Sequence, residues 1–215
     1  MLEIATFTLG PVQTNAYLVA DSETRDAAVI DPAWDGQIIL VEARKRGWRI
    51  AHLWYTHAHF DHIGGAGAIA DGLNPLPLVA LHPNDHILWR AEGGAPLFGY
   101  KIDPGPEPTI DLEQGQILKL GSVEFEVRFT PGHTAGHCIF YVASAQVCFC
   151  GDLIFHESVG RTDLPGGDWD ILVNSIKTQV FTLPDETQLL SGHGPETTVG
   201  QEKKYNPFVG NSFSE

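Results

Sequence analysis

Three histidines and one aspartate stand close together in the segment Thr56-His57-Ala58-His59-Phe60-Asp61-His62. His57 and His59 are two residues apart, so both side chains leave an extended backbone on the same side. Asp61 and His62 follow where the chain is expected to turn into a helix. Imidazole and carboxylate ligands suit zinc, iron and nickel in open catalytic sites, whereas closed structural zinc sites are often built from four cysteines. The segment therefore predicts a catalytic metal site.

Three later segments each place one further ligand-type side chain beside glycine, at the end of an apolar run where a strand is expected to end. These segments are Thr130-Pro131-Gly132-His133-Thr134, Phe149-Cys150-Gly151-Asp152 and Ser191-Gly192-His193-Gly194-Pro195. With the first segment, the chain offers five histidines and two aspartates as candidate ligands. Two ions held close together could lower the pKa of a shared water and polarise a substrate carbonyl.

The elements that must position these ligands recur in both halves of the chain, separated by Gly, Pro, Asp and Asn turns. The expected strands cover residues 4–9, 16–20, 27–30, 50–55, 79–81, 117–120, 123–129, 138–142 and 146–150. The expected helices cover residues 34–47, 63–71, 83–89 and 169–181. This pattern predicts an α/β fold in which two mixed β-sheets pack together and are flanked by helices, an αββα sandwich.

The composition is typical of a globular enzyme. With 43% hydrophobic residues, a chain of 215 residues can bury about 70% of its unfolded surface in one domain, which we expect over residues 1–215. No run of eighteen apolar residues and no basic start followed by an apolar core occurs, so we expect a cytoplasmic protein without a membrane partner. The three cysteines, Cys138, Cys148 and Cys150, are expected to be buried thiols rather than a disulfide framework.

The formal net charge of -14 excludes a polyanion as the expected partner, because phosphate backbones require a basic surface. We therefore expect no nucleic acid. Two bound divalent ions would add about four positive charges at the cleft, so a small anionic substrate can still be attracted there.

Five ordered motifs carry a family resemblance across essentially the whole chain. They are GPVQTNAY from Gly10 to Tyr17 with the Val29-Ile30-Asp31-Pro32 element, the metal-binding segment, TPGHTAGH from Thr130 to His137, GRTDLPGGD from Gly160 to Asp168, and SGHGPETTVGQEKKYNPF from Ser191 to Phe208. In these motifs the chain resembles the hydrolases of the metallo-β-lactamase fold. It is most similar to their short members related to glyoxalase II, the hydroxyacylglutathione hydrolases.

The resemblance implies a ligand set for two divalent ions, zinc in the first place and iron or manganese as alternatives. One ion would be bound by His57, His59 and His133, the second by Asp61, His62 and His193, with Asp152 bridging the two. The same resemblance implies catalytic roles for Asp61, which would also orient the attacking water, and for Asp152. It also implies the αββα architecture.

Several other residues carry two interpretations. Arg161 stands where glyoxalase II-like enzymes place a basic residue that holds a glutathione carboxylate, but it could instead pair with Asp163 or Asp168. The Gly- and Pro-rich residues 92–108 form either a substrate lid or a connector fixed by its aromatic side chains. His137 is expected to make a structural hydrogen bond beside the site. His82 and His86 are expected to have surface or capping roles.

The resemblance favours a thioesterase that acts on S-lactoylglutathione or a related small thioester. Full-length glyoxalase II enzymes carry a helical C-terminal domain that supplies much of the glutathione site, while the printed sequence ends about twenty residues after His193. The alternatives are a persulfide dioxygenase of the same fold, which uses one iron on two histidines and an aspartate, a lactone hydrolase, and a metal-binding protein without catalysis. The Leu164-Pro165-Gly166-Gly167-Asp168 continuation favours the short hydrolases.

Overall fold

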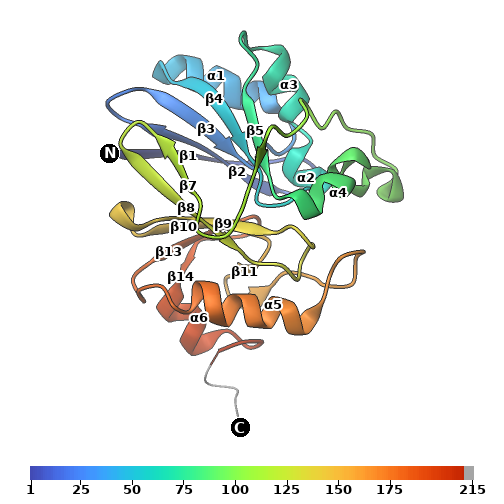
Figure 1. The fold of residues 1–215 in the computed structure, drawn as a ribbon, viewed down its shortest axis with the longest axis vertical. Helices are drawn as coiled ribbons and strands as arrows, with labels where there is room; N and C mark the ends of the chain where they lie inside the picture. The colour runs from blue at the N-terminus through green and yellow to red at the C-terminus, as the bar shows by residue number, and fades with distance from the viewer. Residues whose placement is uncertain (211–215) are drawn as a thin grey trace.

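Two β-sheets pack face to face and helices cover their outer faces in the computed structural model, which describes residues 1–210 (Figure 1). The predicted αββα sandwich of two mixed sheets is thereby confirmed. The expected single domain runs to residue 215, and its last five residues lie outside the described range. One domain over the whole chain stays a prediction.

The first sheet is formed by the N-terminal half of the chain, and its strands lie side by side in sequence order. They are β1 (Leu2–Leu9), β2 (Thr14–Asp21), β3 (Asp26–Ile30), β4 (Arg49–Trp54), β5 (Leu78–Leu81) and β6 (Ile110–Asp111). The first three strands pair antiparallel, and β3 to β6 pair parallel, so this sheet is mixed. The register places Tyr17 opposite Ile30.

The second sheet has the spatial order β14-β13-β10-β9-β8-β7. Its strands are β7 (Ile117–Leu120), β8 (Val123–Phe129), β9 (Cys138–Val142), β10 (Val147–Gly151), β13 (Gln188–Ser191) and β14 (Thr197–Thr198). All neighbours pair antiparallel except β10 and β13, which are parallel. A separate two-stranded hairpin joins β11 (Ile154–Phe155) to β12 (Ser158–Val159).

The helices are short apart from α1. They are α1 (Gly36–Arg46), α2 (Phe60–Ile63), α3 (Ala66–Asp71), α4 (His86–Arg90), α5 (Trp169–Ser175) and α6 (Val199–Tyr205), with the 3₁₀ helices η1 (Pro83–Asp85), η2 (Glu92–Phe98) and η3 (Ala143–Ala145), and the π-helical turn η4 (Ile176–Val180). Helix α1 ends as predicted at Gly47, which takes a left-handed conformation and closes the helix with its own N–H.

Two expectations need correction. The helix predicted over residues 63–71 is divided into α2 and α3 at Gly64 and Gly65. The backbone there lies very close to the loop that follows β3, and a Cβ on Gly65 would be 1.9 Å from the Ala33 carbonyl oxygen. Residues 92–108 were expected to be a loop, but their first part is η2, which is kinked at Gly93 and Gly94.

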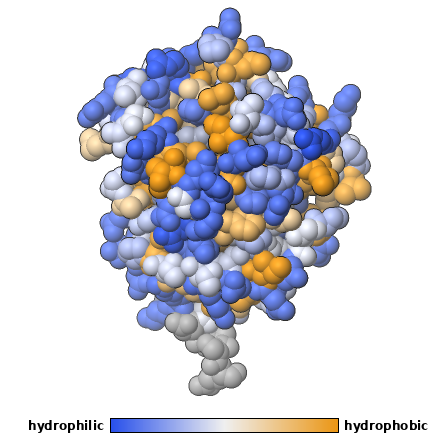
Figure 2. Space-filling model, viewed as in Figure 1, coloured by the Kyte–Doolittle hydropathy of each residue, from blue (hydrophilic) through white to orange (hydrophobic). Residues whose placement is uncertain are grey.

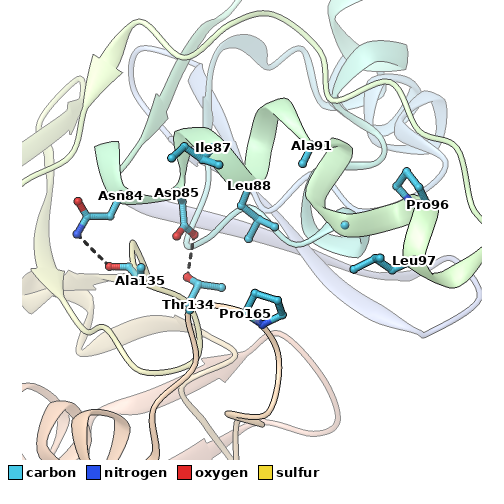
Figure 3. A pocket seen from close by; sticks show the side chains of 12 residues that line it. Asn84, Asp85, Ile87, Leu88, Ala91, Pro96, Leu97, Thr134, Ala135 and Pro165 are labelled. Carbon is cyan, nitrogen blue, oxygen red and sulfur yellow. Dashed lines mark hydrogen bonds between the residues drawn. The ribbon is translucent and has the colours of Figure 1, made fainter.

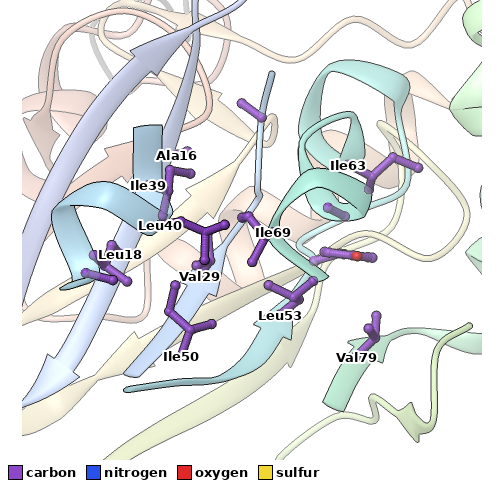
Figure 4. Close-up of a cluster of buried hydrophobic side chains, with 14 of the residues drawn as sticks. Ala16, Leu18, Val29, Ile39, Leu40, Ile50, Leu53, Ile63, Ile69 and Val79 are labelled. Carbon is purple, nitrogen blue, oxygen red and sulfur yellow. The ribbon is translucent and has the colours of Figure 1, made fainter. Parts of the chain in front are cut away.

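The hydrophobic core has three layers, as a four-layer sandwich requires. Successive side chains of β2 point alternately into two of these layers: Leu18 faces α1, and Tyr17 faces the second sheet. Figure 4 shows the outer layer, where Leu18, Ile39, Leu53 and others pack between the first sheet and its helices. The third layer lies between the second sheet and α5, and it contains Cys148 and Cys150 as buried free thiols, as the sequence predicted.

The surface on the face shown in Figure 2 is mostly hydrophilic, with apolar side chains scattered between polar ones. No helix within residues 1–210 is both long enough and apolar enough to cross a membrane.

The sandwich brings the C-terminal ends of four strands to one edge. In the second sheet, β8, β10 and β13 run in the same direction, because β9 is antiparallel to both β8 and β10 and β13 is parallel to β10. Their C-terminal ends are followed by His133, Asp152 and His193. In the first sheet, β4 is followed by the segment with the other four candidate ligands.

The core layer between the two sheets should contribute strongly to stability. Phe140 is fully buried there against Trp54, so Phe140→Ala is expected to lower the free energy of unfolding by about 3 to 5 kcal/mol. Phe208→Ala serves as control, since that side chain is 54% exposed. Urea unfolding with a chelator present compares the two without a contribution from metal binding. Equal losses for both variants would contradict the assignment of this layer.

Candidate metal centre

The structure gathers six of the predicted ligands into two clusters. Within each cluster the ligand atoms lie within 4.8 Å of one another. The first, which we call the tri-histidine cluster, contains His57, His59 and His133, and the second, the mixed cluster, contains Asp61, His62 and His193. The grouping is the one that the resemblance implies. Asp31 also lies beside His57 and His62 in a third group of possible ligand atoms, but its oxygens are used by the hydrogen bonds described below.

Asp152 lies between the two clusters. Its Oδ1 is 3.3 Å from His62 Nε2, and its Oδ2 is 3.6 Å from His133 Nε2 and 3.5 Å from His193 Nε2. One carboxylate thus faces histidines of both clusters. This position suits a bridging ligand.

Unpaired polar atoms support a fit to metal ions. His57 Nε2, His62 Nε2 and Asp152 Oδ1 are buried and have no hydrogen-bond partner within residues 1–210. Buried polar atoms are nearly always hydrogen-bonded, and these three atoms all belong to candidate ligands at the centre of the site. Cations coordinated at this point would satisfy all three, and the donor set of imidazoles and carboxylates suits two divalent ions.

The protein holds the opposite ring nitrogens of three histidines. His57 Nδ1 lies 3.0 Å from Thr56 Oγ1, His62 Nδ1 lies 2.9 Å from Asp31 Oδ2, and His133 Nδ1 lies 2.8 Å from the Arg161 carbonyl oxygen. A hydrogen bond to one ring nitrogen fixes the ring and directs the other towards the ion. In all three rings, Nε2 is therefore the nitrogen that faces the metal centre.

Asp31 connects two of these supports. Its carboxylate accepts hydrogen bonds from both the backbone N–H and the hydroxyl of Thr56, each at 2.7 Å, besides its contact with His62. One buried carboxylate thereby positions the residue before His57 and the ring of His62.

The N-terminal GPVQTNAY motif holds the other side of the mixed cluster. Thr14 donates its hydroxyl to Asp61 Oδ2 at 2.8 Å. The Asn15 amide donates to the carbonyl oxygens of Ser191 and Gly194, and the Tyr17 hydroxyl donates to Ser191 at 2.6 Å. The loop with His193 is thus fixed to β2. Sequence reasoning placed this motif in the resemblance but assigned it no contact with the site.

The two clusters differ in their protonation. Burial lowers the pKa of His57 well below its ordinary value and that of His59 to about 3, and it also lowers the pKa of His133. Burial acts in the same direction on His62 and His193, but there Asp152 and Asp61 outweigh it. The pKa of His62 is raised well above its ordinary value and that of His193 to about 9.

A cavity of about 430 Å³ opens over the clusters. Phe98 and Tyr100 line it and also pack on Phe60, at ring-centroid distances of 5.3 and 5.5 Å, while Trp34 meets Tyr100 at 5.4 Å. The aromatic residues of the 92–108 segment are therefore both anchored and part of the cavity wall. Movement of this segment as a lid stays a prediction.

Arg161 lines the same cavity, but its guanidinium is engaged. It donates to both Asp163 oxygens at 2.7 Å, which is the pairing that the sequence offered as the alternative to substrate binding. The side chain is 54% exposed. Its backbone carbonyl holds His133, and its binding of a substrate carboxylate stays a prediction.

His137 and His82 make supporting contacts of the kind that the sequence predicted. His137 Nδ1 is 2.9 Å from Thr130 Oγ1, and its Nε2 accepts the Asp152 backbone N–H at 3.2 Å, so this ring supports Asp152 rather than binding metal. The His82 ring accepts the Asn84 N–H and caps η1.

Residues 9–193 match the family model of the Metallo-beta-lactamase superfamily. The chain belongs to this superfamily. Similar superfamily sequences include the probable metallo-hydrolase YqgX of Bacillus subtilis, which is 37% identical with 96% of each chain covered. The hydroxyacylglutathione hydrolase GloC of Haemophilus influenzae is 35% identical, with 92% of this chain and 93% of that protein covered.

Solved structures of similar proteins extend over nearly the whole chain. The B3 metallo-β-lactamase BLEG-1 has a TM-score of 0.89 at 35% identity, covering 97% of this chain and 99% of its own. TTHA1623 in a di-iron-bound form has a TM-score of 0.86 at 39% identity, covering 95% and 100%. ETHE1 from Myxococcus xanthus has a TM-score of 0.81 at 26% identity, covering 96% and 84%.

Metal binding at pH 7 should release protons mainly from the mixed cluster. In the metal-free protein the pKa of His193 is raised to about 9 and that of His62 is raised well above its ordinary value, so both hold a proton there, whereas burial lowers the pKa values of the tri-histidine cluster and keeps it neutral. We expect proton release to fall as the pH rises through about 9, because His193 loses its proton over that range before any metal is added. Calorimetric zinc titrations in buffers of different ionisation enthalpy measure the release. A release that stays constant from pH 7 to 10 would contradict this.

Proposed function

We propose that this protein is a binuclear metal-dependent thioesterase that resembles hydroxyacylglutathione hydrolases. Its substrate would be S-lactoylglutathione or a related small thioester. The observation that carries the proposal is the convergence of seven ligand-type side chains, in two clusters joined by Asp152, beside a cavity of about 430 Å³. The identity to GloC of Haemophilus influenzae supports the choice of substrate class.

The tri-histidine cluster and the mixed cluster would each hold one ion, with Asp152 shared between them. Zinc is our first choice, with iron or manganese as alternatives, and iron gains support from the di-iron form of TTHA1623. When bound, such ions supply a water activated for attack and Lewis acidity for the carbonyl oxygen of the thioester.

The chain's own residues orient the reaction. Thr14 fixes Asp61 by donating to Oδ2, which also lies 3.2 Å from His193 Nε2, so this carboxylate is held where it can ligate and orient the attacking water. His137 holds the backbone of Asp152 and so keeps its two oxygens facing both clusters.

The cavity walls would receive the substrate. Phe60, Phe98 and Tyr100 form an aromatic wall that shields the reacting carbonyl from bulk water. Arg161 is the cation on the wall that could accept a substrate carboxylate, in exchange for its pairing with Asp163.

A persulfide dioxygenase is the second candidate function. The structural similarity to ETHE1 favours it, and that activity would require one iron on two histidines and an aspartate. His57 and His59 with Asp152 offer such a set, but Asp61, His62 and His193 would then have no metal to bind. The completeness of the mixed cluster is why we prefer the hydrolase.

Steady-state hydrolysis of S-lactoylglutathione by protein of measured metal content tests the proposal. We expect two metals per chain and a kcat/KM above about 10⁴ M⁻¹s⁻¹, the low end for working enzymes. Asp152→Ala should lose hydrolysis and lower the content of both metals, since it removes the shared ligand.

The outcomes separate the candidates. Two metals without hydrolysis of this or other thioesters would exclude the thioesterase and direct attention to lactones and β-lactams. One iron per chain, with oxygen uptake on glutathione persulfide, would establish the dioxygenase instead.

Arg161→Ala is expected to raise KM for a carboxylate-bearing thioester severalfold, with kcat and metal content little changed, because it would remove a contact made equally in the bound and transition states. Arg90→Ala is the matched control, since that arginine is also exposed and paired with a carboxylate but lies outside the cavity wall. Equal KM values for the two variants would show that Arg161 only braces its own loop.

A further inference from the structure

Asp85 is a buried carboxylate outside the five family motifs. It is the last residue of η1 and the N-cap position of α4, yet its side chain makes no capping hydrogen bond to that helix. An aspartate at an N-cap normally accepts from the first turn of its own helix. Here the side chain is only 1% exposed and its oxygens are used elsewhere.

Those oxygens bind the two segments that supply the tri-histidine cluster. Asp85 Oδ2 accepts the backbone N–H of Ala58, between His57 and His59, at 3.1 Å. The same oxygen accepts the hydroxyl of Thr134 at 2.8 Å, and Oδ1 accepts the Gly136 N–H at 2.6 Å. One carboxylate therefore ties the segment with His57 and His59 to the loop with His133, two parts of the chain that come from different sheets.

The fit around Asp85 is tight. A Cβ on Gly136 would lie 2.7 Å from the Asp85 carboxyl carbon, so the loop can approach only because this residue is glycine. Asn84 adds a hydrogen bond to the Ala135 carbonyl oxygen at 3.2 Å. Figure 3 shows both contacts, Asp85 to Thr134 and Asn84 to Ala135, among residues that line an apolar cavity.

The charge of Asp85 is met by hydrogen-bond donors from the backbone and a hydroxyl rather than by a lysine or arginine. Burying a carboxylate is expensive unless such donors satisfy it. A purely structural joint between two loops could be made by a neutral side chain or by packing. The buried carboxylate of Asp85 instead makes a short, rigid connection between the two loops, because it accepts hydrogen bonds from both.

None of these contacts reaches the mixed cluster. Its members are positioned by Asp31, which binds His62, by Thr14, which binds Asp61, and by Asn15 and Tyr17 on the loop of His193. Asp31 supports both clusters, through Thr56 beside His57 and through His62, whereas the hydrogen bonds of Asp85 reach only the segments of the tri-histidine cluster.

We propose that Asp85 is a positioning residue for the tri-histidine cluster, and that it sets the metal affinity of this cluster separately from that of the mixed cluster. It would do so by fixing the spacing between residues 57–59 and 133–136, so that three imidazoles converge on one ion. The inference rests on metal binding by the tri-histidine cluster and not on the substrate of the proposed function.

Metal titration of Asp85→Asn tests the inference. The amide keeps the shape but replaces one accepting oxygen with a donor, so at least one of Ala58, Thr134 and Gly136 loses its acceptor. Asp185→Asn is the matched control, since that carboxylate is 69% exposed in a surface ion pair with Lys203. Metal-free wild type and both variants are titrated with Co²⁺, whose visible spectrum reports the ligand set at each step.

We expect Asp85→Asn to weaken one of the two Co²⁺ binding steps by about 10- to 100-fold, the usual effect of losing a residue that orients a ligand. The other step should stay near the wild-type value. His133→Gln and His193→Gln identify the steps, and the spectrum of Asp85→Asn at limiting metal should match that of His133→Gln. Asp185→Asn should match wild type in both steps.

Thr134→Val is a milder second variant that removes one donor and keeps the volume. It should shift the same step in the same direction by a smaller factor, and it keeps the test decisive if Asp85→Asn does not fold. Two wild-type binding steps in either folded variant would overturn the inference, as would equal weakening of both steps, which indicates a general loss of structure. Wild type that binds two ions but hydrolyses no thioester would refute the proposed function and leave this inference standing.

Discussion

The metal centre depends on hydrogen bonds that hold the outward nitrogens of buried imidazoles. A ring whose Nδ1 is bound by the protein can offer only Nε2 to an ion, and it can do so in one orientation. The partners of His57, His62 and His133 are a hydroxyl, a carboxylate and a backbone carbonyl from three separate segments. Because two of the three partners lie outside the short segment in which most of the ligands occur, the ligand geometry is a property of the whole sandwich and not of that segment alone.

The sandwich supplies that geometry through strands which end at a common edge. Strand β2 has a further role, because it is buried on both faces and reaches the site at its start. Leu18 packs on the outer helices, Tyr17 packs between the sheets, and the Tyr17 hydroxyl binds the Ser191 carbonyl beside His193. One strand thus joins the packing of two core layers to the position of a ligand loop. A shift of β2 within the core would be transmitted directly to the mixed cluster.

The sequence predicted those features of the structure that depend on residues close together in the chain. The predicted helix ended at Gly47 and the predicted strand ended before Asp152, and both ends agree with the structure. The alternation of Cys148 and Cys150 indicated one face of that strand. Helix α6 was not predicted, because a polar seven-residue helix carries little periodic signal, and strand β13 was indicated only by the apolar run that was expected to end before His193. The role of Asp85 was also missed, since its partners lie 27 to 51 residues away and an aspartate before a short helix is normally its cap.

Part of the cavity wall comes from stretches of chain that supply no ligand. Val12, Phe98, Tyr100 and Leu164 line the cavity, and none of them lies in a segment that supplies a ligand. Substitutions at these four positions can therefore reshape what enters the cavity while the neighbouring contacts of Thr14 and of the Arg161 carbonyl with the ligands are kept. Such substitutions offer a physical route for divergence, because a lineage can exchange one substrate for another while it keeps the same candidate metal ligands. Relatives with nearly superimposable folds and different reactions are what such a division of the chain would produce.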